Sequence, residues 1–158
     1  MLVWAVLMAA PAQAQDLSWR SFERALALAD SSERPVLVDV WAPWCGWCHK
    51  MKREVYPSEG IRSCLAEEFV LTRINRDDRD ATHRYRGQRM SAVQLAQALR
   101  AKSVPTVVLL DADGEYLLHL PGFVEAPDLR WLLGYVASGA YERHSFAAYR
   151  RAHQHPPC

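Results

Sequence analysis

Hydrophobic positions change their spacing several times along the first half of the chain, and each spacing predicts a different element. From Ser18, apolar residues recur every three or four positions, which predicts an amphipathic helix that ends before Pro35. Residues 36–41 (VLVDVW) are almost continuously apolar and rich in β-branched side chains, which is typical of a strand covered on both faces. The following residues, 45–56, favour a helix that ends at Pro57.

The second half repeats this alternation. Residues 76–89 are dense in Arg and Asp and nearly free of apolar side chains, so we expect an exposed loop there, with a partner-docking surface as the alternative. The other predicted elements are a short helix from Ser58, a strand at 69–74, a helix capped by Ser91, a hairpin of strands 104–110 and 116–120, a helix from Pro127 and a final helix at 141–152. This order predicts an α/β fold with four strands in one mixed sheet and helices on both faces.

Length and charge limit the organisation of the chain. With 158 residues, half of them hydrophobic, the sequence suits one domain, which we place at 15–152 before a polar tail at 153–158. Nineteen Lys and Arg against eighteen Asp and Glu leave a net charge of +1. That balance lacks the basic excess of nucleic-acid-binding proteins, so we expect no nucleic-acid partner and a monomer.

The first fourteen residues, MLVWAVLMAAPAQA, carry no charge. Their apolar run spans residues 2–10 and is followed by Ala12-Gln13-Ala14, a pattern typical of a cleaved secretory signal peptide. The run is shorter than the about 20 residues that a membrane-spanning helix needs. The sequence therefore predicts an exported protein that is soluble once residues 1–14 are removed, with a plain N-terminal helix as the alternative.

Two of the four cysteines, Cys45 and Cys48, lie where the strand at 36–41 passes into the next helix. A cysteine at a helix N-terminus faces unpaired backbone N–H groups and the positive end of the helix dipole, which favour its thiolate. Cys45 is therefore the expected nucleophile. Cys48 lies one turn deeper on the same face, which suits attack on a mixed disulfide. A purely structural bridge is disfavoured, because so short a loop stabilises little.

These residues resemble the thioredoxin superfamily. The resemblance rests on residues 38–48 (VDVWAPWCGWC) and on Val104-Pro105-Thr106, and it extends over roughly Pro35 to Val136. Segments between 120 and 149 (LPGF, LLGYV, GAY and SFAAY) further resemble the exported, SoxW-like group of thioredoxin-related proteins. The resemblance implies a thioredoxin-like fold.

The resemblance also implies roles for residues around the cysteine pair. Asp39 matches the buried acid that assists proton transfer at Cys48, with a hydrogen-bonded strand acid as the structural alternative. Pro105 matches a cis-proline beside the disulfide, which leaves the backbone of Val104 free to pair with an extended substrate.

An aromatic rim is implied around the thiols, formed by Trp44 and Trp47 together with Trp41. Trp44, Gly46 and Trp47 are the expected substrate contacts on this side of the site. Gly46 and Trp47 stand between the cysteines, where typical cytoplasmic thioredoxins have Gly-Pro, and His49 follows. This departure means that the redox potential of the family does not transfer to this chain.

The function implied by the resemblance is that of a periplasmic thiol-disulfide oxidoreductase that reduces disulfides in other exported proteins. Sulfur-oxidation proteins and apocytochromes are the implied substrates, and a membrane thiol transporter is the implied electron donor. No cofactor or metal is expected. A zinc site would need a second CxxC or a matched pair of histidines, which the sequence lacks.

Two other functions remain open from the residues. Cys45-Gly46-Trp47-Cys48-His49 also fits C-x-x-C-H, the attachment pattern of c-type haem, so a small cytochrome is one alternative. The other is a redox-inactive binding module that has kept the fold.

The remaining cysteines have structural interpretations. Cys64 lies on an apolar helical face and is expected to pack there as a small hydrophobe. His153, His155 and Cys158 form a loose cluster that is typical of a solvated terminus. A bridge between Cys64 and Cys158 is the alternative in an oxidising compartment.

Overall fold

The computed structural model describes residues 17–158, so the predicted signal peptide at 1–14 lies outside the described residues. The strands are β1 (Trp19–Arg20), β2 (Val36–Trp41), β3 (Val70–Asn75), β4 (Thr82–Tyr85), β5 (Gln88–Ser91), β6 (Thr106–Leu110) and β7 (Tyr116–Pro121). The helices are α1 (Phe22–Ser32), α2 (Gly46–Lys50), α3 (Glu59–Glu68), α4 (Ala92–Ala98), α5 (Ala126–Ala137) and α6 (Phe146–Ala152). A π-helix, η1 (Met51–Val55), continues α2, and a 3₁₀ turn, η2 (Ala140–Glu142), precedes α6.

The main sheet is mixed and has the strand order β1-β3-β2-β6-β7. Strand β3 runs parallel to β1 and β2, whereas β6 is antiparallel to both β2 and β7. Strand β2 is the central strand, and it is buried along most of its length because both faces of the sheet are covered. The loop that follows its last residue, Trp41, leads directly to Cys45.

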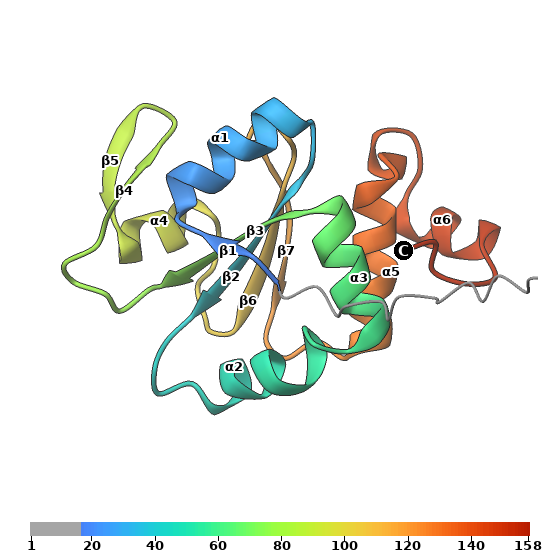
Figure 1. The fold of residues 1–158 in the computed structure, drawn as a ribbon, viewed down its shortest axis with the longest axis horizontal. Coiled ribbons are helices and arrows are strands. Elements are labelled where there is room, and N and C mark those ends of the chain that lie inside the picture. Colours follow the sequence, from blue (N-terminus) through green and yellow to red (C-terminus); the bar gives the residue numbers. More distant parts are fainter. Residues whose placement is uncertain (1–16) are drawn as a thin grey trace, which may run out of the picture.

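Side chains alternate along β2 between two hydrophobic layers. Val36, Val38 and Val40 pack with α1 and α4, while Leu37 packs with η1, α3 and α5. Figure 1 shows α1 and α4 separated by the sheet from α3 and α5, with α2 at the lower end of the sheet. Asp39 has the same parity as Leu37 and therefore lies on the α3 and α5 face.

The predicted fold class is confirmed, but the four-strand detail is wrong, because β1 adds a fifth strand. The chain at Trp19–Arg20 pairs with Leu71 and Thr72 where a helix was expected, and α1 starts only at Phe22. A two-residue edge strand is too short to show the alternation of apolar and polar residues by which a strand is predicted from sequence. The backbone carbonyl of Arg20 accepts a hydrogen bond from the hydroxyl of buried Thr72, at 3.0 Å, which helps to hold this edge.

The prediction that residues 76–89 form a loop is also partly wrong. Strands β4 and β5 form a separate antiparallel hairpin, visible beside α4 in Figure 1. Its polar sequence is explained by its position outside the main sheet: of its eight strand residues only Tyr85 is buried, and Tyr85 donates a hydrogen bond to the carbonyl of Gly114 at 2.9 Å. The predicted cap at Ser91 is confirmed as a full capping box with Gln94.

The chain after α6 turns back onto the domain. Cys158 forms a disulfide with Cys64 of α3, with a Cα–Cα distance of 5.2 Å, and its carbonyl accepts a hydrogen bond from Arg130 of α5 at 2.5 Å. The bridge that the sequence left as an alternative is therefore formed. Cys64 also lies on a buried apolar face, as predicted.

Candidate active site

Cys45 and Cys48 are joined in a disulfide at the start of α2, with a Cα–Cα distance of 5.2 Å. Cys45 is the N-cap residue, and its Sγ accepts a hydrogen bond from the backbone N–H of Cys48 at 3.1 Å. The two side chains are 4% and 1% exposed. Cys45 is thus slightly the more exposed residue of the two, and its sulfur already faces an N–H group that would stabilise a thiolate.

A second segment approaches the disulfide from β6. The Val104–Pro105 peptide bond is cis, and Val104 packs against the buried cluster of Ala42, Cys45 and Cys48. Among residues 17–158, the backbone of Val104 makes no hydrogen bond within the protein, whereas the carbonyl of Pro105 accepts one from Gly122 at 2.8 Å. An unpaired backbone beside a redox-active sulfur can accept an extended peptide as an additional strand.

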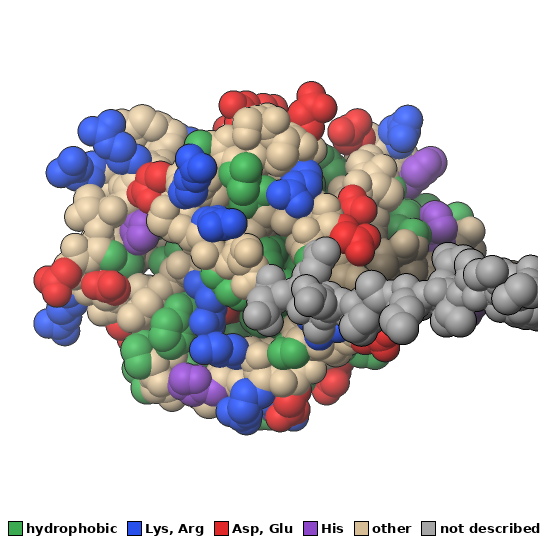
Figure 2. All heavy atoms as spheres, in the orientation of Figure 1, with side chains coloured by type: hydrophobic (Ala, Val, Ile, Leu, Met, Phe, Trp, Pro, Cys, Tyr) green, Lys and Arg blue, Asp and Glu red, His purple; other side chains and the backbone are tan. Residues whose placement is uncertain are grey.

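Exposed aromatic side chains surround the cysteine end of α2. Trp44 and Trp47 are 69% and 58% exposed, and Figure 2 shows hydrophobic side chains at the surface where β2 passes into α2. The indole N–H of Trp44 donates to Asp77 at 2.6 Å, while Trp47 lies against Phe123 with their ring centroids 5.2 Å apart. Large exposed aromatic groups of this kind mark an interaction surface.

Gly46 is the first residue of α2 and leaves open space beside Cys45. A Cβ atom added at Gly46 would meet no heavy atom within 4 Å. The predicted contacts Trp44, Gly46 and Trp47 thus lie on the same loop and first turn as the disulfide. Val104 packs next to the disulfide, and the cis peptide bond joins it to Pro105. Their roles in substrate binding remain predictions.

Asp39 is buried, with 1% of its side chain exposed, and it has two hydrogen-bond donors. The hydroxyl of Tyr56 donates to one carboxylate oxygen at 2.9 Å, and Nε of Arg73 donates to the other at 2.7 Å. Burial raises the pKa of Asp39 above its usual value, although the charge and hydrogen bond of Arg73 oppose that rise. Burial also raises the pKa of Tyr56 well above its usual range, so Tyr56 acts as a neutral donor.

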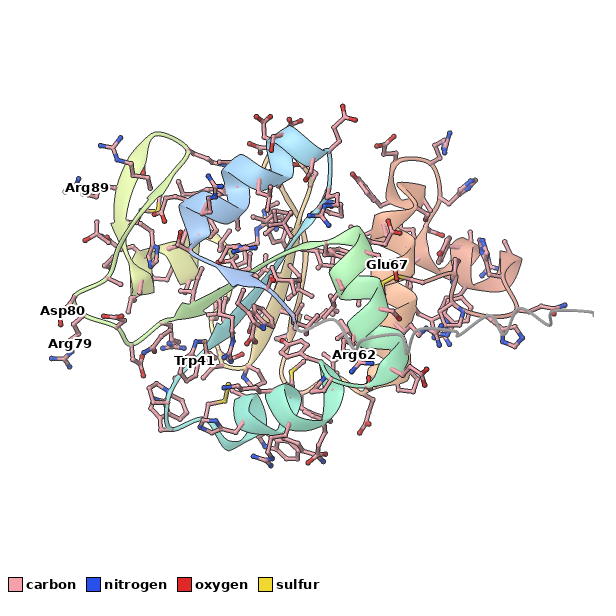
Figure 3. All side chains as sticks on the ribbon, in the orientation of Figure 1. Trp41, Arg62, Glu67, Arg79, Asp80 and Arg89 are labelled. Atoms are coloured by element: carbon pink, nitrogen blue, oxygen red, sulfur yellow. A yellow bond between two sulfur atoms is a disulfide. The ribbon has the colours of Figure 1, made fainter. Side chains whose placement is uncertain are left out.

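Arg73 is a site residue that was missed in the sequence. It is the direct register partner of Asp39 on β3, and its guanidinium lies over the rings of Trp19 and Trp41, at 5.4 and 4.7 Å. Trp41, labelled in Figure 3, also packs against the cysteine cluster, so aromatic contacts join the ion pair to the disulfide. The available signal was a single charged residue inside a largely buried strand, because such a charge needs a partner.

The haem alternative does not fit these residues. Both sulfurs are bonded to each other and buried, and Nε2 of His49 lies 2.8 Å from the carbonyl of Pro43, which it can contact only as a donor. A c-type haem would need both sulfurs for thioether bonds and a His49 ring nitrogen for the iron, whereas Nε2 of His49 here is held by the Pro43 carbonyl.

Within residues 17–158, no helix has the length and apolar character required to cross a membrane. The same part of the chain contains no group of three His, Cys, Asp or Glu side chains placed to hold a metal ion.

The chain belongs to the thioredoxin-like domain family, whose model matches residues 22–137. A thioredoxin-fold protein from Helicobacter pylori superposes with a TM-score of 0.68 and 21% identity, over 77% of this chain and 84% of that one. A thioredoxin from Thermus thermophilus gives a TM-score of 0.63 and 26% identity, over 83% of this chain and 98% of that one. Fold and cysteine pair together are those of a thioredoxin-like disulfide oxidoreductase.

Among curated proteins, the thiol:disulfide interchange protein DsbD of Vibrio vulnificus (strain CMCP6) is 29% identical over 106 residues. The match covers 66% of this chain and 16% of DsbD. This chain therefore corresponds to only about a sixth of the length of that relative.

Proposed function

We propose that this protein is exported to the periplasm and reduces disulfides in other exported proteins. The observation that carries the proposal is the Cys45–Cys48 disulfide at the N-terminus of α2, in which Cys45 is the N-cap residue and the more exposed of the two cysteines. The signal-peptide pattern at residues 1–14 supports export, and the similarity to a thiol:disulfide interchange protein supports the chemistry.

The reaction starts from the reduced protein. The thiolate of Cys45 attacks one sulfur of a substrate disulfide, which forms a mixed disulfide and releases the other substrate sulfur as a thiolate that takes up a proton. Cys48 then loses its proton, and its thiolate attacks the sulfur of Cys45. This step closes the Cys45–Cys48 bond and releases the second substrate sulfur as a thiol. Two electrons pass from the protein to the substrate, and a membrane thiol transporter restores the dithiol.

Asp39 is proposed to assist the second step. Burial raises the pKa of Asp39, which makes its carboxylate a stronger base than an exposed aspartate and suits it to accept the proton of Cys48. Tyr56 and Arg73 hold both oxygens of Asp39 in place, so its orientation is set before the reaction starts.

Substrate is proposed to bind across the cysteine end of α2. Val104 offers unpaired backbone groups to an extended peptide, and Trp44, Gly46 and Trp47 provide an open aromatic border beside Cys45. This border can accept substrates of different sequence, because apolar side chains of many shapes can contact an indole ring.

Trapping of mixed disulfides in the producing cell tests this function. With Cys48→Ala, the second step cannot occur, so exported substrates should accumulate as covalent adducts on Cys45 that reducing agents release. Cys45→Ala is the matched control and should trap none. Adducts in both variants, or adducts formed only with proteins that are not exported, would contradict the proposal.

A further inference from the structure

A cavity of about 310 Å³ opens on the surface between β1, η1 and α3, apart from the cysteine pair. One side of it is apolar. The side chains that matter for its chemistry are Leu17, Trp19, Lys52, Pro57, Arg62 and Arg73. Figure 3 labels Arg62 at the end of α3 that adjoins η1.

Three cationic side chains converge on this cavity from three different elements. Lys52 comes from η1, Arg62 from α3 and Arg73 from β3, and among residues 17–158 no acidic side chain lines the cavity. Within residues 17–158, the side chains of Lys52 and Arg62 make no ion pair and no hydrogen bond. Because Asp39 neutralises Arg73, the excess positive charge at this cavity comes from Lys52 and Arg62, and it produces a positive potential that attracts an anion.

Arg73 is the most constrained of the three cations. Its Nε donates to Asp39, and its guanidinium lies over the rings of Trp19 and Trp41, so these contacts restrict the orientation of the group. Among the described residues, its two terminal nitrogens donate no hydrogen bond. A planar guanidinium held in this way presents paired donors that match the two oxygens of a carboxylate, sulfonate or phosphate.

We propose that this cavity binds a small organic anion whose oxyacid group contacts Arg73, Arg62 and Lys52 while an apolar body lies against Trp19 and Leu17. The mixture of lining residues carries this assignment. A purely inorganic anion would leave the aromatic wall unused, and an uncharged apolar molecule would leave Lys52 and Arg62 without an anionic partner. The site is distinct from the substrate border at Trp44 and Trp47.

Binding of naphthalene-2-sulfonate to the oxidised protein tests the proposal independently of any reductase activity. Naphthalene-2-sulfonamide is the uncharged comparison, and inorganic phosphate is the comparison without an apolar body. We expect one-to-one binding by calorimetry, with the sulfonate at least tenfold tighter than either comparison. In NMR spectra, the indole N–H signal of Trp19, assigned with Trp19→Phe, should shift, while those of Trp44 and Trp47 stay in place.

Charge-neutral variants locate the site. Lys52→Gln and Arg62→Gln should each weaken sulfonate binding roughly tenfold, because each removes a charge-assisted contact. Arg53→Gln is the matched control. It removes a positive charge from η1, the helix that carries Lys52, but Arg53 does not line the cavity. The affinity of this variant for the sulfonate should therefore equal that of the native protein. Absence of binding, equal loss in all three variants, or shifts confined to Trp44 and Trp47 would each overturn the proposal.

Discussion

Asp39 is the residue whose contacts bear most directly on the proposed proton transfer at Cys48. It has the register partner Arg73 on β3 and the hydroxyl of Tyr56 above it, and it is almost fully enclosed. Asp39→Asn keeps a side chain of the same shape but removes the proton-exchanging group. Because general acid-base assistance contributes roughly a hundredfold or more, resolution of the mixed disulfide should slow by about that factor at neutral pH.

The measurement is single-turnover release of a thiol from a preformed mixed disulfide on Cys45, followed between pH 6 and 9. Asp113→Asn, which removes an exposed acid from the β6–β7 turn, is the control and should behave like the native protein. Equal rates for the native protein and Asp39→Asn across this range would leave Asp39 with a structural role only.

The raised pKa of Asp39 also predicts a pH dependence of stability. Between its unfolded-state pKa and its higher folded-state pKa, the folded protein holds a proton that the unfolded chain has lost. The native protein therefore loses stability as the pH rises through that interval, by about 1.4 kcal/mol for each unit of difference. Asp39→Asn lacks this loss, so it should gain stability relative to the native protein on going from pH 4 to pH 8.

Urea unfolding of both proteins at the two pH values checks this sign. A native protein that becomes more stable relative to Asp39→Asn as the pH rises would mean that the ion pair with Arg73 outweighs burial.

At the scale of elements, α4 begins with a capping box. The Ser91 hydroxyl accepts from the N–H of Gln94, and the Gln94 side chain accepts from the N–H of Ser91. Ser91→Ala should lower the free energy of unfolding by about 1 kcal/mol. Ser21, the N-cap residue of α1, makes no such side-chain bond, so Ser21→Ala should change it by less. Equal losses, measured by urea unfolding, would show that the capping box contributes nothing specific.

The local sequence pattern was sufficient to predict an element wherever that element has a regular hydrophobic spacing and a clear end. The strand at Val36–Trp41, the cysteine pair at the following helix and the cap at Ser91 were predicted for these reasons. Strand β1 and the β4–β5 hairpin were not, because a two-residue edge and a polar hairpin outside the core show no such period.

The partners of Asp39 could not be predicted from local pattern either. Tyr56 and Arg73 lie 17 and 34 residues away along the chain, and only the register of β2 and β3 and the path of η1 bring them together. No hydrophobic spacing in the sequence distinguishes the π-helical turn of η1 from an α-helix. That turn nevertheless places the hydroxyl of Tyr56 against Asp39.

At the scale of the whole molecule, the Cys64–Cys158 disulfide closes most of the domain into a loop. The cysteines are 94 residues apart, against three for Cys45 and Cys48, so the long bridge restricts the unfolded chain far more. Gly134 permits the close approach of the C-terminus, since a Cβ there would lie 3.1 Å from Pro157 and from the hydroxyl of Tyr149.

Cys158→Ser should therefore lower the free energy of unfolding by about 2–4 kcal/mol under non-reducing conditions. The control is Cys48→Ser, which opens the short bridge and should cost much less. Urea unfolding compares the two variants. A smaller effect for Cys158→Ser than for Cys48→Ser would contradict the structural role of the long bridge.

The separate roles of Cys45 and Cys48 are tested most directly by mass spectrometry of reduced variants that each lack one of these two cysteines, mixed with insulin. The Cys48→Ser variant should form a stable mixed disulfide on Cys45, the Cys45→Ser variant should form almost none, and the native protein should release reduced insulin chains while its own Cys45–Cys48 bond forms. An insulin adduct on Cys48 in the Cys45→Ser variant, at a rate equal to that on Cys45, would contradict the assignment of Cys45 as the attacking thiol.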